Sequence, residues 1–245
     1  MQHTVTILSR FNGPPKSANG GYACGLMAKK LAGIGDGPVE AALSAPPPLD
    51  AELLLEWTAD TASLLAGGKS IGRASRTALS LDVPALPTPL VLGINPVDAP
   101  DAPGKFVPFE TCFVCGQRRT LGDGLCIHSK EVEGHPGLVA SDWVLDSGLA
   151  SADGNVDLLY IWSALDCPGY FACAAGEAAL LGRLSAEIIA PLKADGTATV
   201  IGWNLTKKPD SRKRQCGTAI FDEEGTLVAK AEGLWITIDP ANLPD

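Results

Sequence analysis

The feature that constrains this chain most is a nearly uncharged stretch at residues 158–175, LLYIWSALDCPGYFACAA, with one carboxylate, Asp166, at its centre. Its apolar and small residues predict a helix of about three to five turns that packs closely against a sheet. A carboxylate inside such a helix costs free energy unless it is paired or used. Asp166 is therefore the first candidate for a functional residue.

A second helix is predicted at residues 17–31 (SANGGYACGLMAKKL), which have similar small-residue and Gly-Tyr content and begin at a good N-cap residue, Ser17 or Asn19. Strand candidates with β-type patterns lie around both helices. In the N-terminal half they are residues 4–11, 39–45, 51–57, 61–66 and 70–81. In the C-terminal half they are residues 124–132, 138–144, 181–189, 197–205, 214–222 and 226–238.

The same order, one helix followed by strands, therefore occurs twice, and short matches support a repeat. Pro-Leu leads to Trp57 in one half and to Trp203 in the other, and GKSIGRA at 68–74 matches GTLVAKA at 225–231. This favours an internal duplication, with chance similarity in an Ala-, Leu- and Gly-rich chain as the alternative. Residues 84–108 hold many prolines, which lack the N–H that a sheet needs, and predict a linker between repeats at 1–83 and 109–245.

Composition narrows the classes of protein. The 245 residues are 46% hydrophobic, enough for one large core or two small ones. No apolar run reaches the ~18 residues that cross a bilayer, and the first residues lack a signal-peptide pattern, so the expected location is the cytoplasm.

The net charge of −9 argues against binding to nucleic acid or to an anionic membrane. Seven cysteines, an odd number, suggest free thiols or a metal site more than a disulfide framework.

One helix and a run of antiparallel strands, present twice, resembles the double hotdog fold of acyl-CoA thioesterases. The resemblance implies an α+β protein in which each of two side-by-side units wraps a sheet around a central helix. In one branch of that family the helix begins with His-Gly-Gly and carries an acid about two turns later. The first Gly there offers its N–H to the thioester carbonyl, the acid acts as base or nucleophile, and the two parts come from opposite units.

In this chain the resemblance divides those parts between the halves. Asn19, Gly20 and Gly21 stand where His-Gly-Gly would, but the residue nine positions after Asn19 is Ala28. Asp166 matches the family's acid, whereas nine positions earlier stands Asp157 followed by two leucines. The resemblance thus implies one composite active site, in which Gly20 and Gly21 face Asp166, and a second site without function.

Two further residues belong to this predicted site. Asn19 replaces the family's His, and Tyr170, one turn beyond Asp166, is expected to orient water or the thioester. Pro168 is expected to kink the helix just after the acid. A second register, which aligns Gly21-Tyr22 with Gly169-Tyr170, would move Asp166 to the helix entrance. A purely structural alternative is that Asp166 caps a broken helix.

A metal site is predicted from a cysteine-rich stretch. Cys112 and Cys115 form a Cys-x-x-Cys-Gly turn, which is typical of a zinc knuckle, and Cys126 and His128 lie two apart on a predicted strand, where side chains point the same way. These four residues are candidate ligands of a structural zinc. Similar Cys-x-x-Cys-Gly stretches in hotdog thioesterases imply no metal, which is the alternative.

A basic cluster flanks Pro209-Asp210 in this acidic chain. Its Lys208, Arg212 and Arg214 are candidates for binding the phosphates of coenzyme A, although a solvated hairpin tip is the commoner role of such residues.

The expected activity is that of an acyl-CoA thioesterase-like hydrolase on a small-molecule acyl thioester. Coenzyme A would be part of the substrate, and no cofactor is required. The alternatives are a non-catalytic acyl-CoA binding protein and a hotdog hydratase, and the second is disfavoured because neither predicted helix contains the His that such a hydratase uses as base. Association of double-hotdog units into a homo-oligomer is left open.

Overall fold

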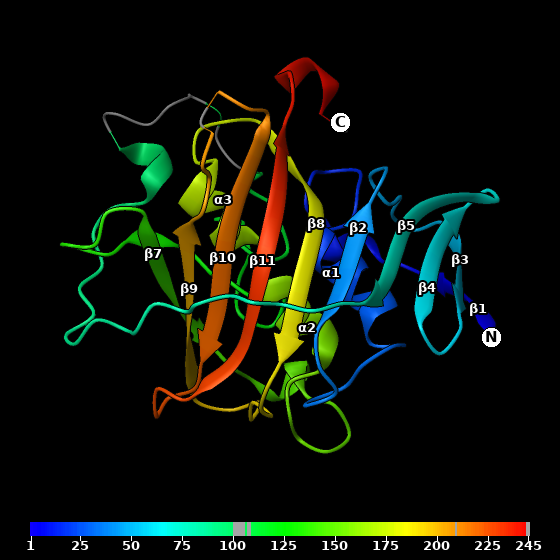
Figure 1. The fold of residues 1–245 in the computed structure, drawn as a ribbon, viewed down its shortest axis with the longest axis horizontal. Helices are drawn as coiled ribbons and strands as arrows, with labels where there is room; N and C mark the ends of the chain where they lie inside the picture. The colour runs from blue at the N-terminus through cyan, green and yellow to red at the C-terminus, as the bar shows by residue number, and fades with distance from the viewer. Residues whose placement is uncertain (100–105, 107–108, 209, 244–245) are drawn as a thin grey trace.

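The computed structural model describes residues 1–99, 106, 109–208 and 210–243. Within these residues eleven strands form one antiparallel sheet in the order β1-β3-β4-β5-β2-β8-β11-β10-β9-β7-β6 (Figure 1). The strands of the N-terminal half are β1 (Gln2–Thr6), β2 (Val39–Leu43), β3 (Glu52–Trp57), β4 (Thr61–Ala66) and β5 (Lys69–Arg76). Those of the C-terminal half are β6 (Lys130–Glu131), β7 (Leu138–Val144), β8 (Ala179–Ile188), β9 (Thr197–Asn204), β10 (Lys213–Phe221) and β11 (Leu227–Thr237).

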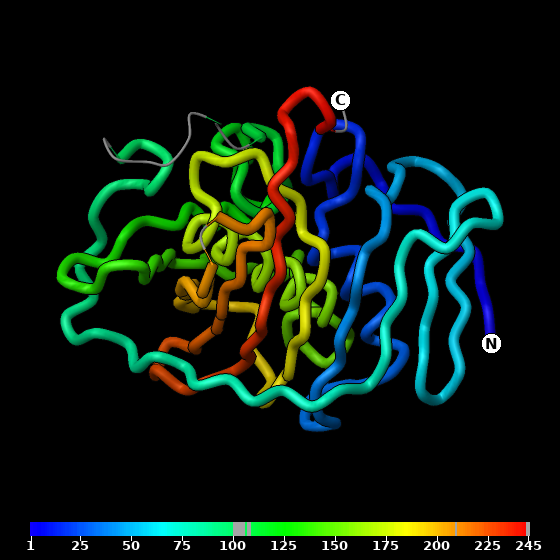
Figure 2. The backbone as a smooth tube through the Cα atoms, turned by 45° about the horizontal axis from the view of Figure 1, so that its top comes forward, coloured from blue at the N-terminus to red at the C-terminus, as the bar shows by residue number. Residues whose placement is uncertain are grey.

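The strand order is symmetric about the centre of the sheet. Strands β3-β4-β5-β2 of one half mirror β9-β10-β11-β8 of the other, and the halves meet where β2 pairs with β8, from Val39 opposite Ala186 to Ala42 opposite Arg183. The two sequence matches noted above fall on equivalent strands, since Trp57 lies in β3 and Trp203 in β9. Figure 2 shows the two halves side by side, each with its helical segment behind the sheet.

Three helices lie on the inner face of this sheet: α1 (Gly20–Ala28), α2 (Leu158–Ala164) and α3 (Cys167–Cys173). The helix predicted at 158–175 is therefore broken at Leu165 and Asp166. Pro168 is the second residue of α3 and has no N–H to continue the hydrogen bonds of α2. The freed carbonyl oxygen of Leu165 accepts a hydrogen bond from the Thr218 hydroxyl at 2.9 Å, which stabilises the break.

Helices α1 and α2 pack closely because α1 presents glycine to its neighbour. Gly21 and Gly25 lie one turn apart on the same face of α1. A Cβ added at Gly21 would lie 2.5 Å from the Trp162 carbonyl oxygen, and one at Gly25 would lie 2.9 Å from the Trp162 Cβ. Any larger residue at either position would push the two helices apart.

The segment after β5 covers the outer face of the sheet. In Figure 1 it crosses in front of the strands, from β5 towards β7. We call residues 77–95 the strap. Four of its leucines and Val83 pack on an outer cluster of the sheet. The leucines are Leu81, Leu86, Leu90 and Leu92, and the cluster is formed by Val132, Leu138, Ala140, Ile201, Trp203, Ala219 and Phe221. The predicted linker at 84–108 overlaps the strap, and its residues 100–105, 107 and 108 lie outside the described part of the chain.

Some predicted elements differ from the structure. The strand predicted at 124–132 is mostly loop. Lys130–Glu131 pairs with β7, and Gly124 and Val132 form only isolated bridges. Cys126 has a φ of 53°, in the left-handed region, which a strand does not use. The first strand is shorter than predicted and is followed by a 3₁₀ turn at Ser9–Phe11. No helix in the described ranges combines the length and apolarity needed to cross a membrane.

Candidate active site

The centre of the candidate site is a contact between the two halves. One oxygen of Asp166, Oδ2, accepts hydrogen bonds from the Gly21 backbone N–H at 2.9 Å and from the Asn19 side-chain amide at 2.8 Å. Asp166 is only 2% exposed. Its other oxygen, Oδ1, is buried and has no hydrogen-bond partner within the described residues. The acid of one repeat therefore faces the helix start of the other, with one oxygen uncommitted.

The N-terminus of α1 provides the other side of this contact. Asn19 is its N-cap, and the Asn19 Oδ1 accepts a hydrogen bond from the Tyr22 N–H while its amide nitrogen donates to Asp166. The first N–H groups of a helix carry partial positive charge. Gly21 uses its N–H on Asp166, whereas the Gly20 N–H makes no hydrogen bond among the described residues. Gly20 thus keeps a donor available for a bound group.

The environment of Asp166 favours its protonated form. Burial raises the pKa of Asp166 to about 7, and the hydrogen bonds from Gly21 and Asn19 only partly oppose this effect. A carboxylate with such a pKa can both take and return a proton near neutral pH.

Asp166 stands at the start of α3 but binds the start of α1. Asp166 occupies the N-cap position of α3, as the second register implied, but its side chain makes no capping hydrogen bond to that helix. Its carboxylate is instead held by α1. The structural alternative, in which Asp166 only caps a broken helix, therefore does not describe its contacts.

A cavity of about 270 Å³ opens beside Asp166. Its wall comes from both halves and is mainly apolar. It includes Leu43 and Pro46 from the N-terminal half and Leu181, Trp235 and Ile236 from the C-terminal half. Gly20 and Asp166 also line it, so the free N–H and the acid border the same space.

Tyr170 lines the cavity, but its hydroxyl is already bound. The hydroxyl donates to the Glu177 carbonyl oxygen at 2.9 Å. The ring therefore contributes to the wall, and the Tyr170 hydroxyl has no further hydrogen to donate to water or to a thioester.

A second site would lie between the end of α1 and the start of α2, and this place holds an ion pair. The Lys29 Nζ lies 3.2 Å from the Asp157 Oδ1, and Asp157 is the N-cap of α2 through a 2.8 Å hydrogen bond from the Leu159 N–H. Lys29 directly follows Ala28, the residue that stands in place of an acid. A salt bridge thus occupies the place where a second site would need a free acid facing a free N–H.

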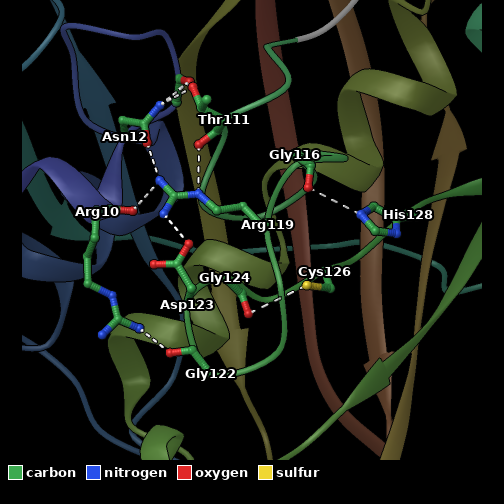
Figure 3. A network of polar contacts seen from close by, with 11 residues as sticks. Arg10, Asn12, Thr111, Gly116, Arg119, Gly122, Asp123, Gly124, Cys126 and His128 are labelled. Carbon is green, nitrogen blue, oxygen red and sulfur yellow. Dashed lines mark hydrogen bonds and ion pairs between the residues drawn. The ribbon is translucent and has the colours of Figure 1, made fainter.

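The structure brings together only two of the four predicted zinc ligands, so the predicted ligand set is wrong. Among the described residues, Cys112 and Cys115 have Cys167 as their third neighbour, and the three sulfur atoms lie within 4.8 Å of one another. Cys126 instead contacts the Gly124 carbonyl oxygen, and the His128 ring lies 3.4 Å from the Gly116 carbonyl oxygen (Figure 3). The reason is local: 124–129 is loop, so the alternation of a strand does not apply.

The loop that carries Cys112 and Cys115 is fixed to the N-terminal half by Arg119. The Arg119 guanidinium donates to the Arg10 carbonyl oxygen at 2.9 Å and to the Asn12 side-chain oxygen at 2.5 Å, and it pairs with Asp123 at 2.7 Å (Figure 3). In the backbone, the Phe113 N–H donates to the Asn12 carbonyl oxygen at 2.7 Å. These contacts place the two cysteines beside the start of α1, and no sequence pattern indicated them.

The three residues of the basic cluster differ in their contacts. Arg214 pairs with Glu177 at 2.6 Å. The Arg212 Nε donates to the Thr237 carbonyl oxygen at 3.0 Å, next to Ile236 and Ile238, which line the cavity. Lys208 is exposed. Arg212 is therefore the member of the cluster that the structure connects most directly to the cavity wall.

Two units, each with a sheet wrapped around helices and joined edge to edge by strand pairing, make this a double hotdog α+β protein, as predicted. Solved structures agree over almost the whole chain. The tesB protein of Mycobacterium avium subspecies paratuberculosis is 13% identical, covers 97% of this chain and 93% of its own, and has a TM-score of 0.63. A Novosphingobium aromaticivorans protein provisionally described as a thioesterase is 15% identical, with coverages of 97% and 96% and a TM-score of 0.62.

A hot dog fold protein of unknown function from Alicyclobacillus acidocaldarius is 11% identical and has a TM-score of 0.55, with coverages of 98% and 94%. Comparison of the sequence alone finds no matching family profile and no matching curated protein. At these identities the structural likeness establishes the fold, and the resemblance to double hotdog thioesterase structures is confirmed at that level.

Proposed function

We propose that this protein is a thioester hydrolase with one composite active site, and that its substrate is an acyl thioester of coenzyme A. The observation that carries the proposal is the contact of Asp166 with Asn19 and Gly21 across the two halves. A buried carboxylate with an unpartnered oxygen, beside an apolar cavity and a free N–H, is a costly arrangement for a purely structural residue.

The proposed chemistry divides the work between the halves. The thioester carbonyl oxygen accepts a hydrogen bond from the Gly20 N–H, which stabilises the negative charge that develops during attack. In one version, Asp166 Oδ1 takes a proton from a water molecule that attacks the carbonyl carbon, the C–S bond breaks, and Asp166 returns the proton to the leaving thiolate. In the other version, Oδ1 attacks the carbon itself, the C–S bond breaks and the thiolate takes a proton from solvent; water then hydrolyses the acyl–Asp166 anhydride, which releases the acid and restores the carboxylate. Both versions use the Asp166 oxygen that has no partner.

The Gly21 N–H and the Asn19 amide have a supporting role. Both bind Asp166 Oδ2, which fixes the orientation of the carboxylate and leaves Oδ1 without a partner among the described residues. Because the Gly21 N–H donates to Asp166, we assign the contact with the thioester carbonyl to Gly20 alone. The apolar wall is suited to an acyl chain, and Arg212 with Lys208 is suited to the phosphates of coenzyme A.

The test is hydrolysis of a panel of acyl-CoA thioesters of increasing chain length, measured as the release of free thiol. Asp166→Asn keeps the shape of the side chain and removes the base, so we expect kcat/KM to fall by about 10²- to 10⁴-fold. Asp157→Asn is the matched control, because Asp157 is a helix N-cap on the equivalent segment but lies in the ion pair with Lys29. We expect Asp157→Asn to retain wild-type activity.

Two results would contradict the proposal: no hydrolysis of any panel member by folded wild-type protein, or equal rates for wild type and Asp166→Asn. Calorimetric binding of an acyl-CoA without turnover would favour the non-catalytic binding protein instead.

A further inference from the structure

Three cysteines meet at one side of the cavity, next to the acid but outside the chemistry proposed for it. Cys112 and Cys115 come from the loop that Arg119 fixes, and Cys167 is the first residue of α3. Each is under a tenth exposed, at 4%, 7% and 5% respectively, and all three line the cavity. None forms a disulfide, and the three sulfur atoms are mutually within 4.8 Å.

The spacing matches a metal-thiolate geometry. The Sγ atoms of Cys112 and Cys167 are 3.7 Å apart. A zinc–sulfur bond is ~2.3 Å, so two thiolates on a tetrahedral zinc ion lie ~3.8 Å apart. These two thiols are thus already separated by about the distance that one ion would require, and the Cys115 sulfur lies within 4.8 Å of both.

The backbone of residues 112–116 also has the form of a metal-binding turn. The Gly116 N–H donates to the Cys112 carbonyl oxygen at 2.9 Å, and a Cβ added at Gly116 would lie 2.5 Å from that oxygen, so only glycine fits. A turn of this kind holds both cysteines of a Cys-x-x-Cys pair close enough to bind one ion.

We propose that Cys112, Cys115 and Cys167 together bind one divalent cation of the zinc class, with the fourth coordination position directed to the cavity. Three sulfur ligands in this spacing select a thiophilic ion over magnesium or calcium. The ion would connect the loop of Cys112 to the first residue of α3 and so would fix the residue beside Asp166. The ligand set differs from the one that the sequence predicted, since Cys167 replaces both Cys126 and His128.

The first experiment is titration of the metal-free, reduced protein with Co²⁺ as a spectroscopic substitute for zinc. We expect a thiolate-to-cobalt charge-transfer band and the visible bands of tetrahedral cobalt, saturating at one ion per chain. Cys112→Ser and Cys167→Ser should each weaken binding by more than about a hundredfold, because loss of a direct ligand exceeds the ~10- to 100-fold cost of losing an outer partner. Cys126→Ser is the matched control and should bind like the wild type.

The second experiment uses wild-type protein only and so does not depend on the folding of variants. Alkylation of the thiols with and without Zn²⁺, read by mass spectrometry of peptides, should show protection of Cys112, Cys115 and Cys167, with Cys126 modified equally in both samples. Zn²⁺ should also raise the melting temperature, since it binds the folded state. Absence of a charge-transfer band, unchanged binding in Cys167→Ser, or protection of Cys126 would each overturn the proposal. These readouts do not involve thioester hydrolysis, so they stand apart from the proposed activity.

Discussion

Replacing Asp166 with Asn should change stability as well as activity, and the size of the change should depend on pH. Burial raises the pKa of this carboxyl from its ordinary 3.8 to about 7 in the folded protein. A group that binds its proton more tightly in the folded state makes that state less stable as pH rises from the unfolded to the folded pKa. Between about pH 4 and pH 7, wild type therefore loses free energy of unfolding that the Asn variant keeps.

The magnitude follows from the two pKa values. The full difference corresponds to ~4 kcal/mol above about pH 7, and ~2 kcal/mol of it is already present at about pH 5. The advantage of Asp166→Asn should thus be about 2–3 kcal/mol larger at about pH 8 than at about pH 5, because pH-independent differences between Asp and Asn cancel. For a chain of this size that is a relative shift of roughly 5–10 °C in melting temperature.

The assay is urea or thermal unfolding of both proteins across this pH range, with a chelator present so that no metal bound beside Asp166 contributes. The variant's own pH series serves as the baseline for every other titrating group. A difference between the two proteins that stays constant with pH, or that grows towards acid, would refute the reasoning that Asp166 is buried at a cost. A variant that is more stable and less active would identify Asp166 as a residue retained for function.

Two further variants test the surroundings of the site. Gly21→Ala should destabilise the fold by about 1–3 kcal/mol, since its Cβ would lie 2.5 Å from the Trp162 carbonyl oxygen. Chemical denaturation measures this against a control, Gly33→Ala, whose added Cβ meets nothing closer than 3.4 Å. Equal stabilities of the two variants would contradict the packing argument. Arg212→Ala should raise KM for acyl-CoA about three- to tenfold with little change in kcat, because one exposed charge contact is worth ~1 kcal/mol. The control is Lys69→Ala, on the β4–β5 hairpin of the other half. A lowered kcat at unchanged KM would contradict phosphate binding by Arg212.

Local patterns in the sequence predicted most of the fold. The strands β2 to β5 and β7 to β11 lie within a few residues of their predicted ranges, because alternation and turn residues act over short distances. Asn19 was recognisable as an N-cap, and Pro168 as the cause of a break. The pairing of Asp166 with the start of α1 was predicted only through the resemblance to a known family.

The cysteine cluster could not be predicted because it depends on contacts between distant segments. The position of Cys112 follows from the docking of its loop by Arg119 on Arg10 and Asn12, more than a hundred residues earlier. Spacing rules instead favoured the nearest candidates, Cys126 and His128, and assumed a strand that does not form. Residues 84–95 of the strap were predicted as part of a linker for a similar reason, since their prolines indicate the lack of strand pairing but not which surface the leucines cover. Residues 77–81 were predicted as the end of a strand, which instead ends at Arg76.

The two halves pair through β2 and β8 and belong to one polypeptide, which changes what mutation can do to them. In a pair of identical chains every substitution enters both halves at once, so neither interface can diverge alone. Here a substitution at Lys29 or Asp157 alters one interface and leaves the Asp166 interface as it was. The interface that holds the salt bridge can therefore accumulate changes, including a new ligand or a regulatory contact, while the Asp166 interface keeps its chemistry.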